Sequence, residues 1–418
     1  MKLCFLGACN EVGRSSVWVK GGEVRLLLDA GIKVHDHNEV PAFARHACDA
    51  AIITHAHLDH SGAAPALYKN GNPPAFCTPP TEPVVQLLLQ DSDKLAEIRK
   101  KPLPYSRAHA KQFAKKTEGI GYNQEYEFHD GSRFSLLDAG HIPGSAQVLY
   151  ECDNKRLLYT GDWNLEETRL QSAAALPDEH VNVLVTESTY GMRDHPPRAK
   201  LEREFCDAIA LELESGNRVL VPCFAVGRTQ EILQVLDAGA PPDAQITLAG
   251  MGAKVNDIIA EFPGYVRDPR ALGEALARAT VVNSAAEAKR ASKKPGIAVA
   301  TAGMLDGGPM LTQLKEANKH GNAVVFLTGY QVKGTNGRML VEEGRMNFDG
   351  HPEPIKLAVR QFDFSAHAGR KQLFARIKKL NPEKVFCVHG DDCAAFAADL
   401  RAQGFDAVAP KTEESFTV

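Results

Sequence analysis

Three histidines and an aspartate fall within six positions of the segment THAHLDHSG, residues 54–62. His55 and His57 leave the apolar run AAII, where side chains two apart point the same way and can converge on one ion. Asp59 and His60 follow as the chain bends toward a helical stretch, so they diverge from the first pair. Burying such a cluster without an ion would carry a large desolvation cost. The segment therefore predicts metal binding, with the ligands shared between two ions.

Three more polar residues close apolar stretches elsewhere: His141 in DAGHIPGS, Asp162 in YTGDWN and His389 in VHGD. Strand ends deliver side chains to the edge of a sheet, so we expect them to complete the site. Nitrogen and oxygen ligands without a thiolate favour two zinc ions, with manganese as the alternative metal. The hypothesis assigns His55, His57 and His141 to one ion, Asp59, His60 and His389 to the other, and Asp162 as the bridge between them.

The elements that position these residues divide the chain into three parts. Residues 1–190 are rich in short apolar strands, and the turns KGGE and CDNK predict hairpins. Residues 191–355 alternate helical periods with buried strands, which predicts a parallel sheet flanked by helices. From residue 356 apolar strands and metal-suited residues return together, so we expect the chain to re-enter its first domain there. The fold class is α/β.

The amino-acid composition limits the class of protein to which the chain can belong. The chain has 418 residues, of which 44% are hydrophobic and 24% are charged, as in a globular protein with a sizeable core. No long apolar run or secretory signal pattern is present, so we expect a cytoplasmic protein. The nine cysteines form no CxxC pair and are interpreted as reduced core thiols. The net charge of −4 excludes a basic footprint over the whole chain, so nucleic acid would be held by local patches or by metal.

The motif series resembles a known family. HAHLDH, with Asp29, His141 and Asp162, is similar to the metallo-β-lactamase fold, an αββα sandwich. TESTYG with Glu187, DFSAH with His367 and VHGD resemble the further motifs of the β-CASP nucleases. PCFAVGRTQEIL, ATAGMLDGGP and GYQVKGTNGR resemble the inserted β-CASP domain of the cleavage and polyadenylation specificity factor-like ribonucleases and their archaeal and bacterial relatives.

The resemblance implies a zinc-dependent ribonuclease acting in RNA processing or decay, with catalytic roles for Asp59, Glu187 and His367. Two divalent ions would leave a net positive centre for a phosphodiester and would activate a water for in-line attack. Asp59 is expected to hold the proton of that water. His367, oriented by Glu187, would protonate the leaving oxygen, giving 3′-hydroxyl and 5′-phosphate ends. Asp29 is interpreted as orienting a ligand histidine; a plain turn aspartate is the alternative.

Several residues are candidates for contact with RNA. Arg228 lies at a predicted helix start in AVGRTQ, and Ser365 belongs to DFSAH. The loop at residues 329–340 contains Lys333, Gly334 and Arg338 and suits an anion nest, although a plain turn fits it equally. Residues 99–116 hold seven Lys or Arg and no acid, with Tyr105 as a stacking candidate. A solvated face is the alternative for that segment.

Endonucleolytic cleavage of single-stranded RNA is the favoured activity. The alternatives are a 5′-to-3′ exoribonuclease, a DNA-directed nuclease of the same fold, a non-catalytic RNA-binding subunit and a small-molecule hydrolase. The predicted ligand set is complete, which disfavours the binding subunit, and a small-molecule hydrolase has no need of the inserted domain. The chain starts at the first strand of the catalytic domain, so we expect no KH-type region to supply sequence-specific recognition. No membrane partner is expected, and a homodimer is left open.

Overall fold

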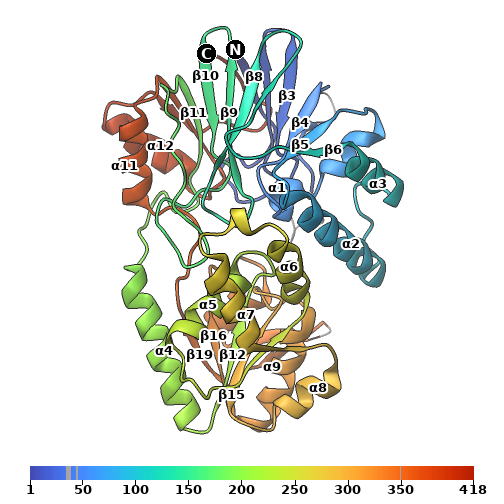
Figure 1. The fold of residues 1–418 in the computed structure, drawn as a ribbon, viewed down its shortest axis with the longest axis vertical. Coiled ribbons are helices and arrows are strands. Elements are labelled where there is room, and N and C mark those ends of the chain that lie inside the picture. Colours follow the sequence, from blue (N-terminus) through green and yellow to red (C-terminus); the bar gives the residue numbers. More distant parts are fainter. Residues whose placement is uncertain (34–38, 44–45, 349) are drawn as a thin grey trace. The chain divides into compact units, whose positions relative to one another are not determined.

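The computed structural model describes residues 1–33, 39–43, 46–348 and 350–418. The described chain separates into two compact units, each coloured along the sequence in Figure 1. None of the helices in these ranges is long and apolar enough to cross a membrane. Unit 1 comprises Met1–Glu167, Ala173–Asp194 and His367–Val418, and unit 2 comprises Thr168–Ser172 and His195–Ala366.

Unit 1 contains two sheets of seven strands each. The first has the order β22 (Ser415–Thr417), β1 (Lys2–Phe5), β2 (Val17–Gly21), β3 (Val24–Leu28), β4 (Ala50–Ile52), β5 (Ala75–Cys77) and β6 (Thr117–Gly119). The second has the order β21 (Ala407–Val408), β20 (Lys384–Val388), β11 (Val183–Glu187), β10 (Lys155–Tyr159), β9 (Ala146–Cys152), β8 (Arg133–Asp138) and β7 (Glu125–Glu127).

The main core of unit 1 lies between these two sheets. Strand β11, with the sequence VLVTE, is buried along its whole length, as an apolar run covered on both faces must be. Val183 and Val185 join the core between the sheets, whereas Leu184 packs with the helices outside. Those helices are α11 (Arg370–Leu380) and α12 (Cys393–Ala402), while α1 (Leu58–Ser61), η2 (Ala64–Lys69), α2 (Thr81–Arg99) and α3 (Arg107–Lys116) lie beside the first sheet (Figure 1). This is the αββα sandwich that the sequence predicts.

Both predicted hairpins are confirmed. Strands β2 and β3 pair in antiparallel fashion around Gly22, whose φ of 57° suits glycine. Strands β9 and β10 pair around Asp153 and Asn154, which adopt φ values of 54° and 58°. Two successive left-handed residues make the turn that matches the twist of a two-residue hairpin, and Asp and Asn tolerate that conformation better than most residues do.

The ends of the parallel strands position the polar residues. Strand β3 runs parallel to β4, and β10, β11 and β20 run parallel to one another. The carboxyl ends of parallel neighbours meet at the same edge of a sheet. Asp162 after β10 and His389 after β20 come together in this way, and His55 after β4 joins them because the first sheet packs against the second.

Unit 2 is built on a six-stranded sheet whose pairings are all parallel. Its order is β14 (Ala279–Val282), β13 (Ile246–Ala249), β15 (Gly296–Ala300), β12 (Arg218–Pro222), β16 (Ala323–Leu327) and β19 (Ala358–Gln361), and a hairpin joins β17 (Arg345–Phe348) to β18 (His351–Pro354). The helices are α4 (Arg198–Glu214), α5 (Arg228–Gly239), α6 (Met251–Ala260), η3 (Pro263–Tyr265), α7 (Pro269–Arg278), α8 (Ala285–Ala291), α9 (Gly308–His320) and α10 (Asn336–Glu343).

Alternate residues of the unit 2 strands enter two different cores. Val219 and Val221 of β12 pack with α4 and α5, whereas Leu220 packs with α9 and α10. The sheet is therefore covered on both faces, as the sequence predicts. Strand β19 pairs with β16, so residues 358–361 complete this sheet, and the chain returns to unit 1 at His367 rather than at residue 356.

A buried glutamate holds the five residues 168–172 in unit 2. Glu231 of α5 accepts hydrogen bonds from the backbone nitrogens of Arg169 and Leu170 at 3.2 and 2.8 Å. It also pairs with Arg198, the first residue of α4. One carboxylate thus ties together three segments that are distant in sequence.

Replacing Glu231 with alanine is expected to destabilise unit 2 by about 3 kcal/mol, because it removes the acceptor of two backbone N–H groups and one of the two carboxylates that pair with the largely buried guanidinium of Arg198. Denaturant unfolding followed by fluorescence measures the loss. Glu274→Ala is the matched control, since Glu274 pairs with Arg270 on the surface; it should cost less than about 1 kcal/mol. Equal losses in the two variants would contradict the structural role of Glu231.

Candidate metal centre

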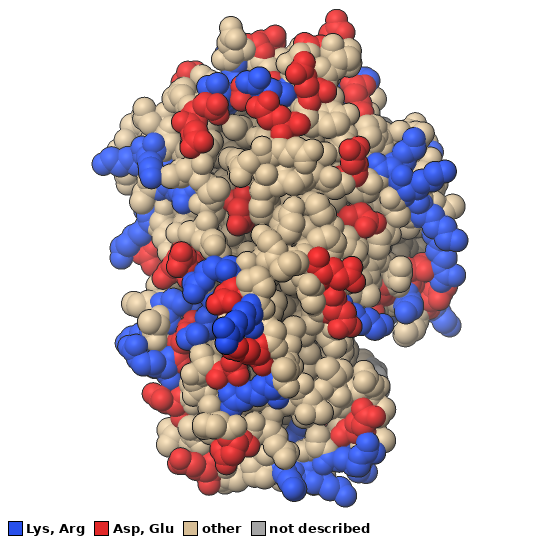
Figure 2. Space-filling view, viewed as in Figure 1, with Lys and Arg blue, Asp and Glu red and all other residues tan. Residues whose placement is uncertain are grey.

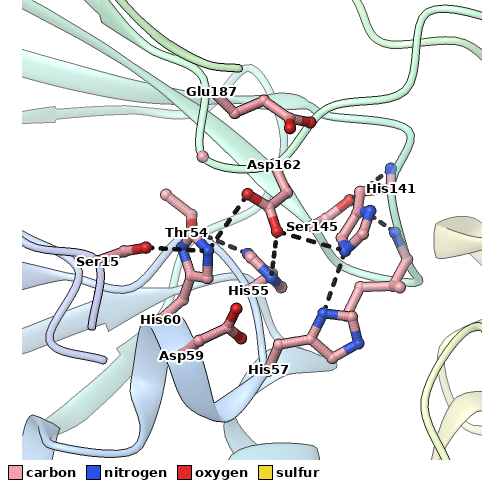
Figure 3. A network of polar contacts seen from close by, with 12 residues as sticks. Ser15, Thr54, His55, His57, Asp59, His60, His141, Ser145, Asp162 and Glu187 are labelled. Carbon is pink, nitrogen blue, oxygen red and sulfur yellow. Dashed lines mark hydrogen bonds and ion pairs between the residues drawn. The ribbon is translucent and has the colours of Figure 1, made fainter. Parts of the chain in front are cut away.

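Three groups of potential metal ligands lie in unit 1, and within each group the ligand atoms are all within 4.8 Å of one another. Two of these groups contain the seven predicted ligands, and the third, which consists of Asp162, Glu187 and His389, overlaps both of them. Figure 3 shows the labelled side chains of His55, His57, Asp59, His60, His141 and Asp162 converging from separate strands and loops. The structure brings together all seven ligand candidates of the sequence hypothesis. The first group is His55, His57, His141 and Asp162, and the second is Asp59, His60 and His389.

Local backbone structure separates the two groups. His55 and His57 lie in the extended segment after β4, whereas Asp59 and His60 lie within the single turn of α1. The change from extended to helical geometry turns the second pair of side chains away from the first. His389 leaves β20 with a φ of 50°, a conformation that is uncommon for residues other than glycine and that occurs at functional sites.

Asp162 lies between the two groups. Its Oδ2 atom is 3.6 Å from His55 Nε2 and 3.8 Å from His141 Nε2. Its Oδ1 atom is 3.3 Å from His60 Nε2 and 3.4 Å from His389 Nδ1. Each carboxylate oxygen therefore faces a different group, which is the arrangement that a bridging ligand requires.

The donor atoms fit a metal because several of them are buried without a hydrogen-bond partner. Among the described residues, this holds for His55 Nε2, His57 Nε2 and Asp162 Oδ1. A buried polar atom left without a partner costs free energy, and such atoms are rare in folded proteins. Imidazole nitrogens and a carboxylate at this spacing would be satisfied together by a divalent cation.

The electrostatics at His55 and Asp162 suit metal ligation. Burial lowers the pKa of His55 well below its ordinary value, and His60 acts in the same direction, so His55 is a neutral imidazole. Burial would raise the pKa of Asp162, but His389 and His60 outweigh it and hold that pKa well below its ordinary value. Neutral imidazole and ionised carboxylate are the protonation states that bind metal.

Asp29 fixes the orientation of His60. It follows β3 in the left-handed conformation, with a φ of 62°, and it is fully buried. Its carboxylate accepts hydrogen bonds from Thr54 N at 2.7 Å and from Tyr159 Oη at 2.8 Å, and it is 2.6 Å from His60 Nδ1. With Nδ1 held in this way, His60 presents Nε2 to the centre.

Four further hydroxyl residues contact the cluster and were missed from the sequence. Thr54 Oγ1 is 3.0 Å from His55 Nδ1, and Thr189 Oγ1 is 3.1 Å from His389 Nδ1. Ser15 Oγ is 3.2 Å from His60 Nε2, and Ser145 Oγ accepts from His141 N at 3.1 Å. The sequence offered a signal for two of them, because Thr54 directly precedes the predicted ligand His55 and Thr189 follows Glu187 by two residues.

Asp29→Asn is expected to weaken metal binding at the group of Asp59, His60 and His389 by about 10- to 100-fold, because an amide cannot accept all these hydrogen bonds or fix the tautomer of His60. Competition titration with a chromophoric chelator measures the affinity of each ion. Tyr159→Phe is the milder companion, since it removes one donor to Asp29. Equal weakening of both ions by Asp29→Asn would contradict this assignment.

A histidine–glutamate pair stands beside the ligands. His367 Nδ1 lies 2.9 and 3.0 Å from the two carboxylate oxygens of Glu187, which is fully buried at the end of β11. The His367 ring lies 4.6 Å from that of His141 and 6.4 Å from that of His389. Burial lowers the pKa of His367, but Glu187 and Asp162 outweigh it and raise the pKa to about 9.

Five other candidates of the sequence hypothesis belong to unit 2. Arg228 opens α5 after Gly227, and Lys333 and Gly334 lie in the turn before α10. Arg338 lies in the first turn of α10 and pairs with Glu342 at 2.6 Å. Ser365 lies one residue before the end of unit 2.

Comparison with known proteins gives family models that match three regions. The metallo-β-lactamase superfamily matches residues 9–189, the β-CASP domain matches residues 229–340, and a Zn-dependent metallo-hydrolase RNA specificity domain matches residues 352–410. A solved structure of a protein of unknown function from Enterococcus faecalis V583 has the same fold, with a TM-score of 0.63 and 14% identity over 100% of this chain and 99% of that one.

Curated relatives match along the full chain. A probable RNase, MJ4, of Methanocaldococcus jannaschii is 37% identical over 100% of both chains. The RNase aCSPSF2 of Saccharolobus solfataricus is 35% identical over 100% of this chain and 85% of its own length. The transcription termination factor FttA of M. jannaschii is 35% identical over 96% of this chain and 69% of its own length. The chain therefore belongs to the β-CASP family of the metallo-β-lactamase superfamily.

Proposed function

We propose that this chain is a metal-dependent ribonuclease that cuts phosphodiester bonds within RNA. The observation that carries the proposal is that seven ligand side chains and the Glu187–His367 pair occur together in one unit. The match to an RNA specificity domain and the full-length similarity to proteins named as RNases support RNA as the substrate.

The proposed cofactor is a pair of zinc ions, with manganese as the alternative, held by the two ligand groups and bridged by Asp162. When bound, the ions would supply Lewis acidity to the phosphodiester and lower the pKa of a water. Asp59 belongs to one ligand group, and its Oδ2 lies 3.3 Å from His389 Nε2. We assign to Asp59 the proton of the attacking water.

His367 is the proposed general acid. In the reaction the oxygen of water bonds to phosphorus, the bond from phosphorus to the 3′ oxygen breaks, and that oxygen takes up a proton. Glu187 holds Nδ1 of His367, so Nε2 delivers the proton. The products are a 3′-hydroxyl and a 5′-phosphate. Glu187 acts as a positioning residue that favours the protonated imidazole.

The proposal also covers the RNA contacts, the cellular compartment and the oligomeric state. We assign RNA contacts in unit 2 to Arg228, Lys333, Gly334, Arg338 and Ser365. We place the activity in the cytoplasm, in keeping with nine cysteines that are all free. The oligomeric state is tested by light scattering on the purified chain, which distinguishes a homodimer from a monomer.

The test uses a labelled linear RNA, its circular form and a DNA strand of the same sequence, each with and without a chelator. Chelator-sensitive cutting of both RNA forms is expected. Cutting of the linear RNA alone would assign the chain as a 5′-to-3′ exoribonuclease, and equal cutting of DNA would remove the preference for RNA. Binding of RNA without cutting would assign a non-catalytic binding subunit.

A further inference from the structure

The basic segment at residues 99–116 is not used by the proposed reaction, and it forms an exposed surface of unit 1. The segment covers the end of α2, the connection to α3, and α3 itself. It holds seven Lys or Arg and no acid, although the whole chain carries a net charge of −4. Figure 2 shows Lys and Arg side chains gathered over α3 and the outer end of α2.

Five lysines of this segment, here called the α2–α3 lysines, make no ion pair within the part of the chain that the structure describes. Arg107 is engaged by Asp93 and Glu97. The five lysines are exposed. Like charges crowded on one surface repel one another, so a polyanion bound there would relieve the repulsion. They are Lys100, Lys101, Lys111, Lys115 and Lys116.

The fold holds these lysines on a defined surface. Phe113 of α3 is buried, and its ring lies 6.1 Å from that of Tyr68 in η2. Ser106 caps the start of the helix. Lys111 and Lys115 are four residues apart and therefore lie on the same face of the helix, away from Phe113. The charged face is thus presented by an anchored helix rather than by a loose loop.

Helix α2 connects this surface to the metal centre. At its start, Thr78 and Thr81 donate hydrogen bonds to Gly144 O at 2.6 and 3.1 Å. Gly144 belongs to the loop of His141. Helix α2 spans 19 residues, so its far end lies roughly 28 Å from that loop, at about 1.5 Å per residue. Stacked nucleotides, at about 3.4 Å each, would need roughly eight to span this length.

We propose that the α2–α3 lysines bind the phosphate backbone of the RNA substrate at a distance from the bond that is cut. This inference rests on the proposed function for the identity of the polyanion. Tyr105 offers no free stacking platform, because it is only partly exposed and its hydroxyl oxygen is buried. The surface therefore recognises charge, which makes its contribution independent of sequence and sensitive to salt.

The experiment measures RNA affinity of the full chain by fluorescence anisotropy in the presence of a chelator, so that nothing is cut. The test variant carries Lys100→Gln, Lys101→Gln, Lys111→Gln and Lys115→Gln. The control variant removes the same charge elsewhere in unit 1, through Lys2→Gln, Lys20→Gln, Lys155→Gln and Lys411→Gln. The probes are a 30-nucleotide RNA and a 6-nucleotide RNA, which in its stacked form is too short to reach from the metal centre to the α2–α3 lysines.

The test variant is expected to bind the long RNA about tenfold more weakly or worse, while the short RNA and the control variant change less than about twofold. For the long RNA, the slope of the logarithm of the association constant against the logarithm of the salt concentration should become shallower by about three. Four lysines are replaced, and each phosphate contact contributes roughly 0.7 to this slope. The proposal is overturned if the test variant binds the long RNA as well as the native chain does, or if the control variant loses as much affinity as the test variant. It is also overturned if a polyglutamate peptide binds more tightly than RNA through these lysines. If the chain binds RNA through these lysines but cuts no RNA, the inference about the lysines is upheld and the proposed function fails.

Discussion

Replacing Asp162 with asparagine is expected to slow RNA cleavage by at least about a thousandfold, equivalent to about 4 kcal/mol of transition-state stabilisation. The two carboxylate oxygens face different ligand groups, at 3.3 Å from His60 Nε2 and 3.6 Å from His55 Nε2. Asparagine keeps the shape of the side chain but replaces one oxygen with an NH₂ group, which cannot coordinate a metal. One ligand of each group is therefore weakened by a single change.

Metal content and rate should fall together in this variant. Metal analysis after gel filtration is expected to give fewer than one ion per chain for Asp162→Asn. Asp59→Asn, which alters the second group alone, should lose one ion and keep the other. Asp153→Asn is the matched control, since Asp153 lies in an exposed hairpin turn where asparagine is equally suited. Two tightly held ions in Asp162→Asn would contradict the bridging role.

The residues that converge at this centre could be predicted because strand ends are visible in the sequence. Asp59 and His389 are 330 residues apart, and their side chains lie 3.3 Å from each other. Their proximity depends on the packing of the two sheets as well as on parallel pairing, because β4 and β20 belong to different sheets. The spacing HxHxDH also carried the division into two groups, because an extended segment followed by a helical turn sends its side chains in different directions.

The hydroxyl residues around the centre could not be predicted in the same way. Serine and threonine occur throughout the chain, and nothing in their type marks the four that contact a ligand. Tyr159 occupies a strand position that reads as ordinary core, yet its hydroxyl donates to Asp29 across 130 residues of sequence. These contacts depend on the packing of loops that the pattern of apolar residues does not describe.

The residue at which the inserted domain ends could also not be predicted from the sequence. Residues 355–364 read as an apolar strand, and such a strand fits a parallel sheet in either unit. The choice is made by pairing: Val359 lies beside Val325 in the sheet of unit 2. Residues 168–172 show the same difficulty, because their place in unit 2 depends on hydrogen bonds to Glu231, which no local pattern announces.

Replacing His367 with alanine is expected to slow cleavage by about 100- to 10,000-fold while RNA affinity and metal content stay nearly unchanged, because His367 supplies a proton and is no part of either ligand group. Single-turnover kinetics with saturating enzyme separate the chemical step from binding. Glu187→Gln should have a smaller effect, since it removes only the group that orients the imidazole. His180→Ala is the matched control, because His180 faces Glu383 on the surface at 3.9 Å.

The assignment of His367 to the leaving group can be separated from a general loss of geometry. An RNA with sulfur in place of the leaving 3′ oxygen departs as a thiolate, which needs no proton because a thiol is a far stronger acid than an alcohol. His367→Ala should therefore cut this substrate at nearly the rate of the native chain, whereas Asp162→Asn should remain slow on both substrates. If sulfur substitution fails to restore the His367 variant, the histidine acts on positioning rather than on proton transfer.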